Sequence, residues 1–211
     1  MEIRASFNPK DLEVAFLTEF AARLNSFIPS IIGKIKPIIF DLINTSVKNS
    51  NEYMAMVSGE LFGQFGEVNI VKAIEDVIKA IADNSQINVN RFVITGSQIS
   101  GSFEIGVLKL DYSEVLSLPS VSFISENGFQ IEWLRWLLLE SDRKIINDYS
   151  FSLNSRTVGF SRTGTGIMKR GLGWGVPSVY SGTAIDNWLT RALQKIDETI
   201  IKELYSIIDK L

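Results

Sequence analysis

The sequence predicts a single α+β domain spanning residues 1–211, for three reasons. Apolar residues recur with a helical period over residues 1–84, the pattern changes to the alternation of strands over 85–154, and a helical period returns over 184–211. We expect an antiparallel or mixed sheet packed against N-terminal helices and a long C-terminal helix. Residues 155–183, rich in Gly, Ser, Thr and Arg, are expected to form an extended arm on the surface.

The first helix is predicted to begin at Pro9, with Asn8 as its N-cap. One face of this helix is a row of apolar residues at four-residue spacing: Leu12, Phe16, Phe20 and Leu24. We expect a break at residues 26–29 and a second helix over 31–47, which Pro37 should kink or split.

The elements of the middle follow from changes of period. A polar turn at residues 48–52 and a helix over 70–82 precede two alternating segments, 88–98 and 102–111, which predict a β-hairpin around the turn-forming linker 96–101.

Further along, residues 121–124 are expected to add a short strand, and 144–153 alternate weakly. Between them, the apolar run 131–139 predicts a short helix that places Trp133 and Trp136 on one face. These two tryptophans, with Trp188, are expected to lie in the core.

The last helix is predicted to begin at Thr183, with Asp186 completing a capping box. Over residues 184–211 it would be roughly 40 Å long. Packing on the chain's own sheet is the favoured arrangement, and overhang onto a neighbouring subunit is the alternative.

Trp174 is expected to behave differently from the other tryptophans. It lies between Gly173 and Gly175 with few apolar neighbours in the sequence, so we expect it to need an external surface. On this hypothesis, Trp174→Ala would leave the isolated fold intact and impair assembly.

The composition excludes several kinds of chemistry. The chain has no cysteine and no histidine, so a disulfide framework, a Cys/His zinc site and a Ser-His-Asp triad are impossible. The glycine-rich stretch 159–170 has no Gly-Lys-Ser/Thr at a helix start, as a phosphate loop would require. No carboxylates have a calcium-binding spacing. We therefore expect no catalytic residues, no cofactor and no metal, and a chain that is not an enzyme.

The charge pattern leaves one question open. The net charge is −3, yet residues 156–170 carry four basic side chains and no acidic one. Such a cluster could meet phosphate or an acidic partner, or be a solvated loop. No uncharged apolar run approaches the ~20 residues of a membrane span and the N-terminus has no signal pattern, so we expect synthesis in the cytoplasm and no membrane partner.

Four segments resemble stretches of virion structural proteins of long-tailed bacteriophages, of the neck and tail-completion (head–tail junction) type. The similarity extends from about residue 52 onward and is most specific in the block W-x-V-P…GT-x-x-[DN]-N-[FW]-[LI]-T-R-A. The segments are SGELFGQFG (58–66), IEWLRWLLLESDRKIINDY (131–149), SRTGTGIM (161–168) and WGVPSVYSGTAIDNWLTRAL (174–193).

The resemblance implies a structural subunit of the virion, made in the host cytoplasm. Such subunits form homo-oligomeric rings, commonly six- or twelve-membered, and contact other proteins of the neck and tail. The arm is the expected assembly interface, through these residues: Arg156, Arg162, Met168, Lys169, Arg170, Trp174, Val176, Pro177 and Tyr180.

Two alternatives remain. One is a baseplate or other tail position, which co-purifying proteins would distinguish. The other is a phage nucleic-acid-associated protein that uses the basic cluster, which a steep salt dependence of DNA affinity would reveal. The acidity of the whole chain argues against nucleic acid as a partner.

Overall fold

The computed structural model describes residues 8–107, 112–125, 128–141, 143–152, 163–194 and 196–210, and it confirms the α+β class. The helices are α1 (Pro9–Lys48), α2 (Asn51–Val57), α3 (Glu60–Phe65), α4 (Ile70–Asp83), α5 (Ser113–Leu116), the 3₁₀ helix η1 (Pro119–Val121), α6 (Trp133–Leu139), α7 (Trp188–Leu193) and α8 (Ile196–Ile208). The strands are β1 (Gln86–Thr95), β2 (Gln98–Gly106), β3 (Phe123–Ile124), β4 (Gln130–Ile131), β5 (Tyr149–Ser152) and β6 (Ile167–Arg170).

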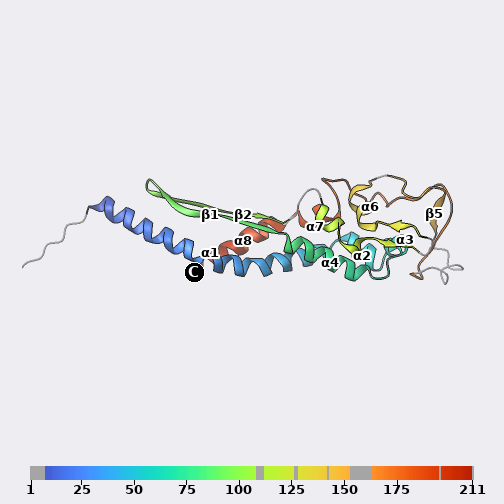
Figure 1. Ribbon diagram of the computed structural model, residues 1–211, viewed down its shortest axis with the longest axis horizontal. Helices are drawn as coiled ribbons and strands as arrows, with labels where there is room; N and C mark the ends of the chain where they lie inside the picture. The colour runs from blue at the N-terminus through green and yellow to red at the C-terminus, as the bar shows by residue number, and fades with distance from the viewer. Residues whose placement is uncertain are drawn as a thin grey trace, which may run out of the picture.

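The molecule is elongated (Figure 1). In its narrow half, α1 is accompanied by the β1–β2 hairpin and by α8, both of which contact it. The wider half holds the short elements, among them α2, α3, α6 and β5 (Figure 1). The first turns of α1 extend beyond both the hairpin and α8, and form one tip of the molecule.

α1 is one continuous helix of 40 residues, about 60 Å long. The start at Pro9 with Asn8 as N-cap is confirmed, but the break predicted at residues 26–29 is wrong, and Pro37 does not split the helix. Both Pro29 and Pro37 are exposed, so the carbonyl groups that lose their N–H partners lie on the solvent side, where water can satisfy them. α1 changes direction in its N-terminal half (Figure 1).

The opposite side of α1 is a row of buried branched residues at four-residue spacing: Ile31, Ile35, Ile39, Ile43 and Val47. α8, β1, α4 and α7 all contact α1. The helix predicted at residues 70–82 is confirmed as α4, whose apolar face (Ala73, Ile74, Val77, Ile78 and Ile81) belongs to the same core. The core is therefore built along one side of α1.

A single side chain of α1 ties the hairpin to the helix. The hairpin is confirmed, with an irregularity of register between Asn90 and Val93. Within this irregularity the Phe92 backbone pairs with Asn25: the Phe92 N–H donates to Asn25 Oδ1 at 2.9 Å, and Asn25 Nδ2 donates to the Phe92 carbonyl at 2.8 Å. The Phe92 ring lies over Gly101, where a Cβ atom would come within 2.5 Å of it. The helix amide thus supplies the two hydrogen bonds that a strand neighbour would otherwise make.

The sequence predicts one sheet, but the described strands do not form one. The described strands make three separate antiparallel pairs, β1–β2, β3–β4 and β5–β6. The segment predicted as a strand at residues 121–124 is shorter than expected, because its first residue closes η1. Two-stranded pairs have little stability alone, so each depends on the helices packed against it.

The C-terminal helix also differs from the prediction. It begins at Trp188 rather than after Thr183, and the structure describes it as α7 and α8, with residue 195 outside the described part. Asn187 is the N-cap: its Oδ1 accepts from the N–H groups of Leu189 and Thr190. α8 packs along α1, not on a sheet of the kind expected.

Replacing Asn25 with Ala should loosen the hairpin selectively. The change removes two hydrogen bonds to the Phe92 backbone, so we expect the free energy of unfolding to fall by about 1–2 kcal/mol. Amide exchange in β1 and β2 should accelerate more than exchange in α4. Asn44→Ala, the same change on the same helix, is the control, because the Asn44 side chain makes no hydrogen bond to the described residues. Equal effects of the two substitutions would contradict this role for Asn25.

Candidate functional site

The structure places the predicted arm residues in different environments. Arg156 and Arg162 lie outside the described residues. Met168, Lys169 and Arg170 belong to β6, which pairs with β5. Met168 is half-buried against the core, Lys169 is half-buried, and only Arg170 is exposed. The described part of the arm is therefore mostly packed against the rest of the chain. The prediction that the arm is extended on the surface is wrong for these residues.

Trp174 is buried within its own chain. Only 6% of it is exposed, and its ring meets Trp136 edge-on at 5.9 Å and Phe65 at 6.3 Å between centroids. Its indole N–H donates to Gln64 Oε1 at 3.3 Å, and its backbone bridges to Ile146. The expectation that Trp174 needs an external surface is wrong, because α3 and α6 supply that surface.

The glycines beside Trp174 explain why the sequence misled us. Gly173 has φ of +107°, a conformation that favours glycine, and a Cβ atom on Gly175 would lie 2.3 Å from the Arg143 carbonyl oxygen. Both residues let the backbone pass close to the segment before β5. The two glycines thus permit close packing, whereas the sequence pattern indicated a loop without local support.

The remaining predicted contacts, Val176, Pro177 and Tyr180, line the entry to the C-terminal helix. Val176 is 5% exposed and belongs to the core, so the prediction that it is a surface contact is also wrong. The Pro177 carbonyl accepts from the N–H groups of Tyr180 and Ser181, which closes a turn. Tyr180 is half-buried against the core.

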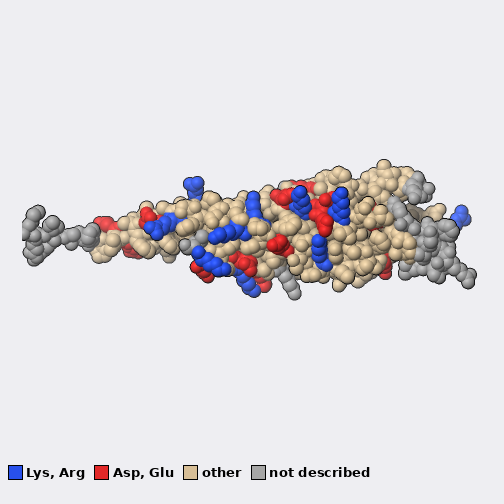
Figure 2. All heavy atoms as spheres, turned by 90° about the horizontal axis from the view of Figure 1, so that it is seen from below, with Lys and Arg blue, Asp and Glu red and all other residues tan. Residues whose placement is uncertain are grey.

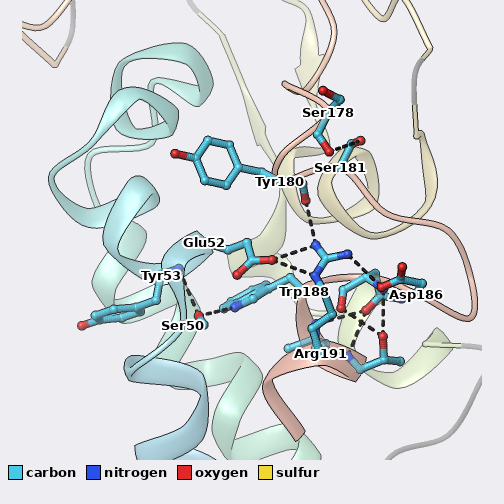
Figure 3. Close-up of polar contacts among 12 residues, drawn as sticks. Ser50, Glu52, Tyr53, Ser178, Tyr180, Ser181, Asp186, Trp188 and Arg191 are labelled. Carbon is cyan, nitrogen blue, oxygen red and sulfur yellow. Dashed lines mark hydrogen bonds and ion pairs between the residues drawn. The ribbon is translucent and has the colours of Figure 1, made fainter. Parts of the chain in front are cut away.

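This turn leads to a cluster of polar contacts centred on Arg191, which we call the Arg191 cluster: Glu52, Tyr180, Asp186 and Arg191 (Figure 3). Arg191 Nε and Nη2 both donate to Glu52 Oε1, at 3.0 and 2.7 Å. Nη1 donates to Asp186 Oδ1 at 3.0 Å, and Nη2 also donates to the Tyr180 carbonyl at 3.2 Å. One guanidinium therefore joins α2, the turn and α7.

Buried contacts on either side extend this connection. Trp188 is fully buried and donates from its indole N–H to Ser50 Oγ at 2.8 Å, and Ser50 caps α2 (Figure 3). Asn187 Nδ2 donates to Tyr112 Oη at 2.8 Å, and the Asn187–Thr190 capping box is complete. The residues of the block D-N-W-L-T-R therefore have structural roles within the chain.

The electrostatics of the cluster are those of a structural contact. Burial lowers the pKa of Arg191, but its hydrogen bonds to Glu52 and Asp186 outweigh burial and raise the pKa above its ordinary value. The guanidinium is thus charged at any physiological pH. Glu52 is only 7% exposed and needs this cation, because an unpaired buried carboxylate is costly.

Two exposed apolar side chains lie beside the cluster. Val179, 71% exposed, lines an open hollow of about 490 Å³ with Arg191, Ser46 and Asn49. Ile185, 81% exposed, lines another with Arg191 and Gln194. The sequence pattern places Ile185 on the apolar face of the last helix, which is wrong, because the helix begins only at Trp188. Neither Val179 nor Leu172 after β6, which is 90% exposed, was expected to lie at a contact surface. Their sequence neighbours include buried residues, so the sequence pattern gave no sign of which side chains would lie outside.

The surface charge is mixed. Figure 2 shows Lys and Arg interspersed with Asp and Glu along one face, without a continuous basic stripe. Within the described ranges, no cluster of three or more Asp or Glu side chains is placed to hold a metal ion. Nor does any helix of the described chain have the length and apolarity to cross a membrane.

Comparison of the chain with protein-family models, with curated proteins and with solved structures found no match.

Replacing Trp174 with Ala should destabilise the isolated chain, contrary to the hypothesis from the sequence. Loss of a buried ring between Phe65 and Trp136 should lower the free energy of unfolding by about 3–5 kcal/mol. Leu172→Ala, two residues away and almost fully exposed, should change it by less than about 0.5 kcal/mol. Denaturant unfolding of both variants measures this, and a fully stable Trp174→Ala chain would show that the ring is not buried in solution.

Replacing Arg191 with Ala should also destabilise the chain, because it leaves Glu52 buried without a cation. We expect a loss of about 2–3 kcal/mol. Arg191→Lys should recover little of it, since a lysine cannot make the two-pronged contact with Glu52. Arg143→Ala is the matched control, because Arg143 pairs with Glu140 at 2.8 Å while 71% of its side chain is exposed, and it should cost less than about 1 kcal/mol. Similar losses for Arg143 and Arg191 would refute the role of burial.

Proposed function

We propose that this chain is a non-enzymatic structural subunit of a phage virion, which forms a ring at the neck or tail terminus and joins head-proximal and tail components. The observation that carries the proposal is the distribution of uncovered apolar side chains. Such side chains occur along the whole described molecule, and two sets of them lie at opposite ends of α1: Leu12, Phe16 and Phe20 near its start, and Val179 beside its end.

These two surfaces are far apart. Val179 shares its hollow with Ser46 and Asn49, about 50 Å along α1 from Phe16. Exposed apolar side chains are ordinary when scattered, but groups of them mark interaction sites. A ring subunit uses two different surfaces for its neighbours and a further one for the next component, and an elongated molecule separates such surfaces well.

The polar groups of the candidate site support a structural role. Arg191 engages both Glu52 and Asp186, so the most prominent group of charges binds parts of the chain to one another. The intermixed charges of Figure 2 support a protein partner better than nucleic acid, which would favour a continuous basic surface.

The direct test is removal of the chain from the phage that encodes it. We expect unjoined heads and tails in electron micrographs, and the chain itself in purified particles by mass spectrometry. Joined heads with defective baseplates would instead favour the baseplate position. Normal, infectious particles that lack the chain would refute a virion role.

Val179→Gln combined with Ile185→Gln should separate assembly from folding. Both side chains are exposed, so we expect the unfolding temperature to stay within about 2 °C of the original. The variant should restore far fewer infectious particles than the original chain when supplied to a phage lacking it. Val68→Gln, 54% exposed between α3 and α4, is the control. Full restoration of infectivity by the double variant would exclude this surface from assembly.

A further inference from the structure

Two rows of apolar side chains in the narrow half of the molecule remain uncovered. The first, which we call the α1 ridge, consists of Leu12, Phe16 and Phe20, with 61%, 68% and 47% of each residue exposed. The Phe16 and Phe20 rings stack at 6.2 Å, with planes only 4° apart. The ridge is thus an ordered apolar surface.

The α1 ridge lies on the part of α1 that neither α8 nor the β1–β2 hairpin covers. α8 runs along α1 but ends well short of its first turns, and the hairpin also stops before them (Figure 1). Over residues 9–20 every side chain except Leu17 is exposed. These turns gain no tertiary stabilisation from the described parts of their own chain, so their apolar side chains are free to contact another molecule.

The second row, the α8 ridge, consists of Ile201 and Tyr205, with 52% and 65% exposed. Leu204 and Ile208 beside it are half-buried and pack against the core. The α8 ridge is therefore on the side of α8 turned away from its own core.

We propose that the α1 ridge of one copy of this chain packs against the α8 ridge of the next copy. Both rows run at four-residue spacing, the pattern that interdigitates between helices crossing at about −50°. A neighbour's α8 then continues the helix-on-helix packing that the chain's own α8 begins. Because the two ridges differ, the contact is heterologous and repeats from copy to copy, as a ring requires. The inference rests on the proposed ring and adds the contact that forms it.

The area suits a contact between copies. At about 200 Å² for a whole aromatic side chain, the two ridges expose on the order of 500 Å² of apolar surface. Since a little over half of an interface is apolar, the full contact is about 1,000 Å², close to the lower limit for a specific interface. A contact of this size is weak alone, so its strength would come from ring closure.

The surrounding charges favour a protein over a lipid surface as the occupant. Glu19 and Arg23 flank the α1 ridge as an ion pair, and Lys202 and Glu203 follow Ile201 on α8. A helix that lies on an anionic membrane carries an excess of Lys and Arg on its polar face. Pairing of two α1 ridges with each other would leave the α8 ridge uncovered, whereas the heterologous contact covers both.

Mixing two defective variants tests the contact. Phe16→Gln with Phe20→Gln disables the α1 ridge, and Ile201→Gln with Tyr205→Gln disables the α8 ridge. Each variant should be monomeric alone by sedimentation equilibrium at high protein concentration, while an equimolar mixture at the same concentration should form a dimer through the one intact pair of ridges. The unaltered chain should associate further with increasing concentration. Phe40→Gln on α1 and Val71→Gln on α4, both 41% exposed, should associate as the unaltered chain does.

Three results would overturn the contact. The first is an unaltered chain that stays monomeric up to its solubility limit, and the second is a mixture that stays monomeric. The third is a dimer formed by the α8-ridge variant alone, because it would show that two α1 ridges pair with each other. Circular dichroism melting shows whether each double variant is folded. If one is not, the single changes Phe16→Gln and Tyr205→Gln should each weaken association at least tenfold, and unchanged association would overturn the contact. A chain absent from particles that still forms the mixed dimer would refute only the virion role.

Discussion

The buried row on α1, from Ile31 to Val47, lies on the helix that α8, β1, α4 and α7 all contact. Full burial of one such side chain contributes roughly 1.5–3 kcal/mol, so the five together rank among the largest favourable contributions in the fold. Because α8, β1, α4 and α7 all contact α1, this helix organises the narrow half of the molecule (Figure 1). Where the buried row gives way to exposed residues, α1 has no cover from its own chain.

The Arg191 cluster is the second constraint, since it joins parts of the chain that are distant in sequence. Arg191 and Glu52 are 139 residues apart, and Trp188 reaches Ser50 across 138. Their contacts fix the start of α7 against α2. Asn187, Trp188 and Arg191 lie within five residues of one another, and each makes one of the contacts that join α7 to distant parts of the chain.

Elements with a strong local period were predictable from the sequence. The amphipathic face of α4 and the alternation of the β1–β2 hairpin are both visible in the local sequence. The effect of Pro29 and Pro37 was predicted wrongly. Whether a proline breaks a helix depends on whether its ring lies on the solvent side or the core side, and the sequence alone does not show this. The start of the C-terminal helix was placed four residues early, since Thr183 and Asn187 are both good caps and only Asn187 finds Tyr112.

The candidate site was less predictable than the fold. Trp174 looked unsupported because its partners, Phe65 and Trp136, are far away in sequence. Val179 lies within the turn closed by the Pro177 carbonyl and Ile185 lies just before α7, so their exposure depends on how these loops pack and not on their neighbours in the sequence. Surfaces for assembly consist of the side chains that the chain leaves uncovered. Predicting them therefore requires the packing of the whole chain to be known.

Hydrogen–deuterium exchange at several protein concentrations most directly tests whether the start of α1 depends on another copy. The account predicts that amides of residues 31–47 are protected at every concentration. Amides of residues 13–20, beyond the unpaired first turn, should exchange fast in dilute protein and at least tenfold more slowly once the protein associates. Strong protection of residues 13–20 in the dilute monomer, or fast exchange there in the associated protein, would contradict it.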